Sequence, residues 1–476
     1  MSFITRRKPI DGITQQDGHQ RLTPTLTWPH LVAMGVGAIV GTGIYTLTGV
    51  GAGLAGPGVI LSFLLCGVIC SCAALSYAEM ATMIPTAGSA YTYTYSVLGE
   101  FLAWIVGWSL ILEYTVGSAA VAVGWSAHIA EFIHGHVPGA LLYGFATIDP
   151  ETHMHGLINL PAVLITLAVT GLLVVGTRES ATVNLVLVAI KMSALVVFVV
   201  LASQRFDLSH FHPFLPFGLL AQTDPDGTKR GVLAAAAIIF FAFWGFDAVS
   251  TAAEETKDPG RNLTIGIIGS MAICTIIYIV VAAAALGAAS YTVIAKTAAP
   301  LVYVLNGLNY PLAGEIIALA AVVALPSVIL VLLYGQSRIF FVMARDGLIP
   351  RRLAAIHKTR GTPALMTVIT GIVAAAFAGT FDISHIAAVA NAGTLFAFVA
   401  VSLCVLVLRV REPGRARVFR VPIVWFFAPL CIVSCIYLFI VGLQDITHRF
   451  FFYWNLVGIA VYLLYGVRAS RLAKAS

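Results

Sequence analysis

Three charged residues stand inside otherwise apolar stretches of the chain: Lys191 in "LVAIKMSALVV", Glu113 in "LILEYTVG" and Asp247 in "FFAFWGFDAVS". Burying a charge in a membrane costs about 2.5–3.5 kcal/mol on insertion scales, so such residues usually face the protein interior and pair or function there. Loss of water favours a neutral amine, so Lys191 could gain and lose a proton; a static salt bridge is the alternative. Glu113 could attract a cation, or hold a proton and hydrogen-bond between helices.

The composition identifies the environment of these charges. Of the 476 residues, 59% are hydrophobic and 10% are charged, and the mean hydropathy is +0.94, which leaves too little polar surface for a protein in water. Uncharged stretches such as 262–295 are long enough for a membrane helix of about 20 residues and lack the alternation of membrane strands. The sequence therefore predicts an all-α integral membrane protein with twelve transmembrane helices, at residues 28–54, 57–84, 100–133, 157–176, 179–202, 231–255, 263–288, 312–344, 361–380, 385–409, 421–443 and 450–467.

The basic residues predict the orientation. If both termini are cytoplasmic, Lys191 lies within a span and the outer side holds few of the 27 lysines and arginines, namely Arg205, Lys229, Arg230, Lys296 and Arg449. That asymmetry follows the positive-inside rule. The net charge of +6 then reflects orientation and anionic lipid rather than nucleic acid. We expect a multi-pass protein of the plasma (inner) membrane without a cleaved signal peptide.

The first span is unusually rich in glycine. "GAIVGTGIYTLTGVGAG" runs from Gly37 to Gly53, although glycine destabilises a helix interior. Non-helical backbone in a membrane must line a cavity or be buried in protein. We therefore expect a break around Gly41 to Gly43; close packing of helices through small residues is the alternative.

A second interruption lies in the sixth span, where "FFAFWGFDAVSTAAEE" meets Gly245 and Asp247. Because the first and sixth spans enter the membrane from opposite sides, a five-helix unit repeated once would be inverted. Paired broken helices in corresponding halves are a sequence sign of a secondary transporter's binding site. We expect a cytoplasmic segment (1–26), a first repeat (27–202), an extracytoplasmic loop (203–230), a second repeat (231–410) and two further helices with the C-terminus (411–476).

Histidines and cysteines give no pattern typical of a cofactor, metal or catalytic site. All seven cysteines fall within predicted spans, where they behave as small apolar residues. His134/His136, His153/His155 and His210/His212 form three His-x-His pairs in outer loops; a metal or pH-sensing role is one interpretation and plain solvation the other. We expect no enzyme activity, no cofactor and no metal.

Four segments together resemble the amino acid–polyamine–organocation transporters, and most of all their cationic amino acid transporter branch with its prokaryotic members. These segments are "GVGAIVGTGIYTLTG", "ALSYAEMATMIPTAGSAYTYTYSVLGEFLAWIVGWSLILEY", "FWGFDAVSTAAEETKDPGRN" and "YGQSRIFFVMARDGLIP". The similarity covers the first ten spans. It implies a five-plus-five inverted repeat with helices 1 and 6 discontinuous, two added C-terminal helices, and amino acids as substrates.

The resemblance also implies how an amino acid would bind. The N–H groups that follow the first break, with the positive end of the helix dipole, suit the α-carboxylate, and the freed carbonyls suit the α-ammonium. The donors would be those of Gly41, Thr42 and Gly43, and the acceptors those of Ile39, Phe241, Ala242 and Trp244. Phe241 and Trp244 would form an outer gate, or pack as ordinary core aromatics.

In sodium-independent relatives, a lysine at the place of Lys191 occupies the position of the sodium ion, which implies that Lys191 bridges spans one and eight and couples transport to protons. Glu113 would read a cationic side chain, as in the cationic branch. Asp247 is expected to cap the second half of helix 6, and Ser327 to leave room in the distal pocket. Glu79, Glu254 and Glu255 are expected to pair with loop arginines, such as those in "RDGLIPRR", or to be solvated.

We therefore expect a proton-coupled, sodium-independent amino acid transporter for small neutral or cationic substrates, with an exchanger without proton coupling as the alternative. A channel would need a continuous polar pore ring, and a sensor an output domain, so both are disfavoured. The expected partners are the substrate, protons and membrane lipid. Since no cysteine lies in an outer loop, no disulfide-linked partner is expected.

Overall fold

The computed structural model describes residues 6–11, 22–41, 43–133, 137–145, 155–225, 228–297, 299–357, 360–381, 383–443 and 445–475. Within these ranges, nine helical stretches are long and apolar enough to cross a membrane, and three shorter apolar helices accompany them. The predicted helical membrane class is therefore confirmed. The bundle helices are α2 (Trp28–Ile39), α3 (Thr48–Ala55), α4 (Val59–Met83), α6 (Glu100–Ile133), α7 (Leu160–Val175), α8 (Thr177–Ser203), α9 (Val232–Ile239), α10 (Ala248–Thr251), α11 (Pro259–Ala288), α14 (Pro311–Arg345), α15 (Ala364–Thr380), α16 (Ile383–Arg411), α17 (Val424–Tyr437) and α18 (Asp445–Val461).

Short elements connect these helices. Residues 222–230 carry an antiparallel pair of two-residue strands, in which Gln222 lies opposite Arg230 and Thr223 opposite Lys229. This pair falls within the segment predicted as the 203–230 loop. The short elements are α5 (Ser89–Val97), α12 (Tyr291–Ile294), α13 (Pro300–Gly307), α19 (Val467–Ala469), α20 (Arg471–Ala475), β1 (Gln222–Thr223) and β2 (Lys229–Arg230).

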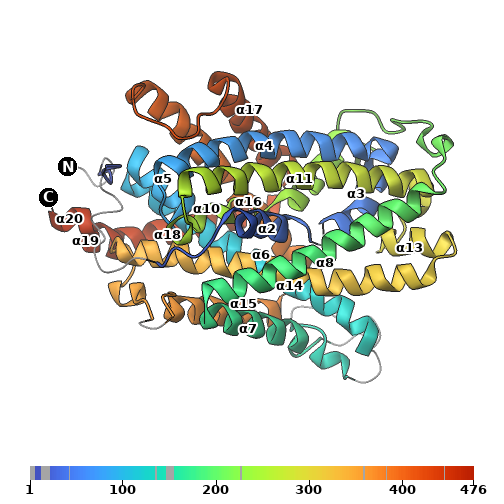
Figure 1. Cartoon of the computed structure of the whole chain (residues 1–476), viewed down its shortest axis with the longest axis horizontal. Coiled ribbons are helices and arrows are strands. Elements are labelled where there is room, and N and C mark those ends of the chain that lie inside the picture. The colour runs from blue at the N-terminus through green and yellow to red at the C-terminus, as the bar shows by residue number, and fades with distance from the viewer. Residues whose placement is uncertain are drawn as a thin grey trace.

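Most bundle helices run along the long axis of the molecule, with the broken first span at the centre (Figure 1). Helix α2 packs against α8, α11 and α14. Helices α7 and α15 pack together at one side, and α17 lies on the opposite side against α4 and α16. Both chain ends lie at the same end of the molecule (Figure 1), which we call the terminal end.

The first span is broken where the glycines predicted it. Helix α2 ends at Ile39, Val40 has an extended conformation (φ −77°, ψ 93°), and a π-helical turn, Gly43–Leu47, leads into α3. The expected interruption is therefore present in the first span. It leaves backbone groups that a continuous helix would have paired.

The sixth span is also broken. Helix α9 passes into a 3₁₀ turn, Phe240–Phe243, and Trp244 is extended (φ −69°, ψ 147°). Gly245 follows at φ 109°, a conformation that only glycine adopts without strain. The chain then resumes as the single turn of α10. The glycine that the sequence singled out is thus the point where the chain turns.

In the middle of α14, a neighbouring helix supplies the hydrogen bond that a proline removes. Pro326 has no N–H and leaves the Val322 carbonyl, four residues earlier, without its helical donor. The Trp125 indole of α6 donates to that carbonyl at 2.8 Å. This contact fixes α6 against α14 next to Ser327, the residue that follows the proline.

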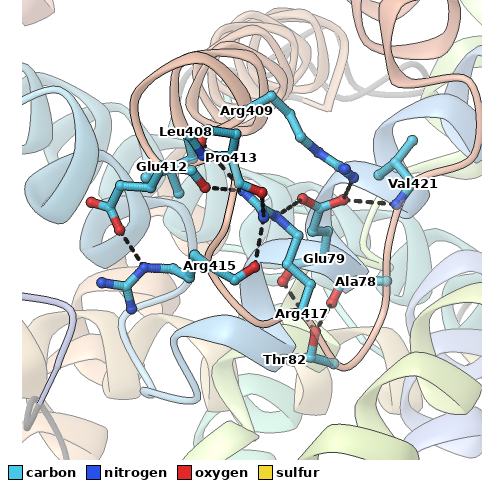
Figure 2. A network of polar contacts seen from close by, with 10 residues as sticks. All are labelled: Ala78, Glu79, Thr82, Leu408, Arg409, Glu412, Pro413, Arg415, Arg417 and Val421. Carbon is cyan, nitrogen blue, oxygen red and sulfur yellow. Dashed lines mark hydrogen bonds and ion pairs between the residues drawn. The ribbon is translucent and has the colours of Figure 1, made fainter.

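A buried ion cluster at the end of α4 ties three segments together (Figure 2). The Glu79 carboxylate accepts hydrogen bonds from Arg409 (2.5 Å), Arg417 (3.0 Å) and the Val421 N–H (2.7 Å). Arg417 also donates to the Glu412 carbonyl just beyond α16. Glu79 is therefore an ion-pair partner, as one interpretation predicted, although Arg409 lies in the last turn of α16 and Arg417 just beyond it rather than in "RDGLIPRR".

Candidate functional site

The two breaks face each other in the core. A Cβ atom added to Gly43 would lie 2.6 Å from the Ala242 Cα atom, and one added to Gly245 would lie 2.8 Å from the Ala38 Cβ atom. The backbones therefore approach more closely than any side chain would permit. The residues predicted around the first and sixth breaks are brought to one place.

Tyr278 of α11 joins the two breaks, and sequence reasoning missed it. Its hydroxyl lies 2.6 Å from the Ile39 carbonyl oxygen and 2.9 Å from that of Ala242. These are two of the four carbonyls predicted to receive an ammonium group. The available signal was a single tyrosine within the apolar run "CTIIYIVV", but one hydroxyl in a long span does not reveal its partners.

Lys191 of α8 binds the back of the first break. Its ammonium donates to the carbonyls of Gly37 (2.8 Å) and Val40 (2.6 Å) and to the Ser327 hydroxyl (2.9 Å), and the side chain is fully buried. These contacts link α8 to the end of α2 and to α14. None of the ion pairs in the described part of the chain includes Lys191, so the static salt bridge weighed above is absent there.

Ser327, predicted to leave room in the distal pocket, is hydrogen-bonded behind the first break. Besides accepting from Lys191, its hydroxyl lies 3.2 Å from the Gly37 carbonyl and 2.6 Å from that of Ala324. Ser327 is thus part of the lysine's surroundings behind the first break.

Glu113 lies beside the second break. Its Oε1 atom accepts hydrogen bonds from the Trp244 indole and from the Thr394 hydroxyl of α16, the latter at 2.6 Å. The Trp244 ring stacks on Phe241 with centroids 5.7 Å apart. Glu113 therefore fixes the aromatic pair predicted as a gate, and Thr394 was not anticipated because it is far away in sequence.

The expected role of Asp247 as a side-chain cap is wrong in this structure. Asp247 occupies the N-cap position of α10, but its carboxylate makes no capping hydrogen bond there. Instead, its Oδ2 atom accepts from the Tyr114 hydroxyl of α6 at 2.5 Å. The tyrosine next to Glu113 turns the carboxylate toward α6, because a buried carboxylate takes the strongest donor in reach.

The structure describes two of the three residues whose N–H groups were predicted to bind a carboxylate. Gly41 is buried directly after α2, and no acceptor is recorded for its N–H within the described segments. Gly43 begins the π-helical turn. Thr42 lies outside the described residues.

Ion pairs join α14 and the residue after it to the segment that follows α10 and to the N-terminal segment. Arg345 binds Glu254 through two hydrogen bonds (3.0 and 2.7 Å), and Arg338 binds Glu255 in the same way (3.0 and 3.0 Å). Lys8 pairs with Asp346 at 2.7 Å. The predicted pairing of Glu254 with the arginine of "RDGLIPRR" is therefore confirmed, and Glu255 pairs with an arginine inside α14.

Of the predicted histidine pairs, the structure describes His155, His210 and His212. His134, His136 and His153 are not among the described residues. The ring of His155 donates to the Phe145 carbonyl, and that of His210 donates to the Gly287 carbonyl. Within the described part of the chain, no group of histidine, cysteine or acidic residues could hold a metal ion. The seven cysteines are buried, as their positions predicted.

Replacing Gly43 by alanine tests the close approach of the breaks. The new methyl group would push against the Ala242 backbone, and overpacking of this kind costs about 1–3 kcal/mol. We expect substrate affinity to fall by about tenfold to a hundredfold, measured by binding to the purified protein. Gly171→Ala is the matched control, because nothing lies within 4 Å of its added Cβ; equal affinities for both variants would contradict the prediction.

Comparison with known proteins identifies what this chain is similar to. Residues 26–462 match the family model described as amino acid permease. The chain is 40% identical to the branched-chain amino acid permease BcaP of Bacillus subtilis (strain 168), over 98% of this chain and 99% of that protein. It is 38% identical to the methylthioribose transporter of the same organism, with 100% of both chains covered. It is 37% identical to the vacuolar cationic amino acid transporter 2 of Arabidopsis thaliana, over 87% of this chain and 64% of that protein.

Proposed function

The chain belongs to the amino acid permease family, and we propose that it is a proton-coupled, sodium-independent amino acid transporter that works by alternating access. It is a transporter and not an enzyme. The observation that carries the proposal is the close approach of two broken helices, which Tyr278 joins, with Lys191 bound behind the first break. Backbone groups freed at such breaks suit the two charged ends of an amino acid.

We infer that twelve segments cross the membrane and that the first ten form a five-plus-five inverted repeat. The packing of the described helices supports this. In such a repeat, α4, α6, α7 and α8 correspond to α11, α14, α15 and α16. The pairs α4–α11, α6–α14 and α7–α15 are each in contact, and the contact between α6 and α16 has its counterpart in the contact between α14 and α8. A pseudo-twofold axis in the membrane plane produces such a pattern.

The terminal end is proposed to face the cytoplasm of a plasma (inner) membrane. With both termini on that side, the sequence leaves only five of its 27 lysines and arginines in the outer segments, which supports that orientation. Opening to the cytoplasm then requires the Arg345–Glu254 and Lys8–Asp346 pairs to separate. The Leu26 N–H, which donates to the Glu255 carbonyl at 2.8 Å, would have to part in the same movement.

The substrate's α-carboxylate is proposed to bind the N–H groups of Gly41 and its neighbours, where the positive end of a helix dipole lies. The α-ammonium is proposed to bind the carbonyls of Ile39 and Ala242. Each carbonyl oxygen has two lone pairs, so both can accept from an ammonium while they share the single hydrogen of the Tyr278 hydroxyl. Tyr278 thus holds two of the acceptors at a fixed separation.

Lys191 is proposed to carry the coupled proton. When charged, it holds α2 and α14 to α8 through three hydrogen bonds. A neutral amine donates more weakly than an ammonium, so loss of the proton would loosen α2, the helix that must move for alternating access. Obligate exchange of amino acids uses the same site and is the alternative mechanism.

We propose neutral amino acids with apolar side chains as the first substrates to test. Two donors already occupy Oε1 of Glu113, and the neighbouring Phe241 and Trp244 rings suit an apolar side chain. The name of the branched-chain permease, matched over nearly its full length, supports the same choice. Cationic substrates remain the alternative, since the plant relative carries that name.

Uptake into proteoliposomes tests the proposal. We expect radiolabelled leucine or alanine to accumulate above its equilibrium level only with an inward proton gradient, and sodium to have no effect. Unlabelled arginine and methylthioribose are added as competitors, because the names of two relatives suggest these alternative substrates. A fall in uptake of the labelled amino acid would show that the competitor binds. Uptake without a gradient, dependent on amino acid loaded inside, would show exchange instead; displacement by methylthioribose alone would overturn the amino acid assignment.

A further inference from the structure

Two buried carboxyl groups near the second break each keep one oxygen atom without a hydrogen bond. Glu113 and Asp247 are at most 1% exposed. Oε1 of Glu113 is bound by Trp244 and Thr394, and Oδ2 of Asp247 by Tyr114. The remaining atoms, Oε2 of Glu113 and Oδ1 of Asp247, have no partner in the described structure. A buried acceptor left in this condition is costly unless a ligand or proton satisfies it.

Two hydrogen bonds place the carboxyl groups near each other: Tyr114, the residue after Glu113, donates to Asp247, and Trp244, three residues before Asp247, donates to Glu113. The other titratable groups in range of the pair are Cys70 and Tyr77 of α4, Tyr93 of α5 and Tyr114 of α6. All four are neutral groups under ordinary conditions. Among the described ion pairs, none reaches either carboxyl group.

Tyr77 gives independent evidence that this place is built for a ligand. Its hydroxyl is fully buried and has no hydrogen-bond partner in the described structure, and its ring packs against Phe246, the residue before Asp247. The ring is held by edge contacts with Tyr93 (6.3 Å), Phe246 (5.8 Å) and Phe398 (5.7 Å). The aromatic packing therefore keeps a polar atom beside the carboxyl pair.

Two neighbouring carboxylates in a medium of low polarity repel each other, and no cation of the described chain offsets their charge. Such pairs bind one proton between them and titrate as a unit. The donors from Trp244 and Thr394 on Glu113, and from Tyr114 on Asp247, stabilise either carboxylate when it alone is charged, because hydrogen bonds to a carboxylate favour its charged form. They do not remove the repulsion between the two charges when both groups are ionised.

We propose that Glu113 and Asp247 form a carboxyl pair that binds one proton, as a second proton site separate from Lys191. With the proton bound, the pair carries a single charge spread over hydrogen-bonded oxygens, and an apolar substrate side chain meets less charge. A cationic side chain would supply the same positive charge and displace the proton. The pair therefore decides which substrate class the site accepts, and its existence does not depend on the role of Lys191.

Infrared spectroscopy of the purified protein without substrate tests this site directly. We expect the wild type at neutral pH to show the carbonyl stretch of a protonated carboxylic acid, which shifts in D₂O. The band should disappear in Glu113→Gln and in Asp247→Asn, because the remaining carboxylate keeps its own hydrogen-bond donors and needs no proton. Glu315→Gln, which changes an exposed residue, should leave the band intact.

The outcomes separate the possibilities. No band in the wild type, or a band retained in both variants, overturns the proposal; loss in one variant alone means that one residue is protonated independently, which also overturns it. If a variant fails to fold, the infrared band of Tyr114→Phe provides a second measurement. The band must shift, because Asp247 loses the hydrogen bond that the Tyr114 hydroxyl donates. Since no substrate is present, the result is independent of whether uptake is found.

Discussion

Lys191→Met is expected to abolish proton-driven uptake. Methionine is unbranched and one atom shorter than lysine, and it removes the three hydrogen bonds to Gly37, Val40 and Ser327. Hydrogen bonds from a charged donor contribute about 1.5–3 kcal/mol each, so loss of the set allows α2 to leave its position. We expect uptake under an inward proton gradient to fall by about tenfold or more, to the level measured without a gradient.

A second substitution separates charge from proton exchange. Lys191→Arg keeps a positive charge but cannot lose its proton in the working pH range. We expect it to bind substrate while accumulation driven by the gradient is lost. Ser193→Ala on the same helix is the control, because the Ser193 hydroxyl is exposed and bonds only within α8. Gradient-driven accumulation that survives in Lys191→Arg would mean that Lys191 does not exchange the coupled proton.

Glu255→Gln is expected to produce the largest loss of stability. The Glu255 carboxylate binds Arg338 through two hydrogen bonds and also accepts from Thr177 (2.5 Å) and the Tyr334 hydroxyl. Arg338 is fully buried and stays charged at any accessible pH. Removing its counter-ion leaves an uncompensated charge inside the protein, which costs about 3–5 kcal/mol. Thermal unfolding of the purified protein measures the effect as a lowered midpoint.

The double variant Glu255→Gln with Arg338→Met serves as the matched comparison. Replacing both members of a buried pair is far less damaging than removing one, because no charge remains to be solvated. We expect the double variant to unfold at a higher temperature than Glu255→Gln alone, and the exposed Glu315→Gln to match the wild type. Equal midpoints for the single and double variants would show that packing, not charge, accounts for the loss.

The positions of the helices and of both breaks were predictable from the sequence, because they depend on local properties. Continuous apolar runs require helices in a membrane, and Gly41 to Gly43 and Gly245 mark the points where the backbone departs from a helix. The burial of Lys191 and Glu113 was equally predictable, since a charge in an apolar run must face the interior. These inferences need no knowledge of what lies opposite.

The partners of these residues depended on the tertiary structure. Tyr278 joins Ile39 to Ala242, Thr394 and Trp244 share one oxygen of Glu113, and Tyr114 draws Asp247 away from the expected cap. Each contact joins helices whose relative rotation and depth follow from the packing of the whole bundle. The sequence by itself determined where charge and broken backbone lie along the chain. Only the tertiary structure decided which donor reaches which acceptor, because a hydrogen bond requires two atoms within about 3 Å and no local pattern sets that distance.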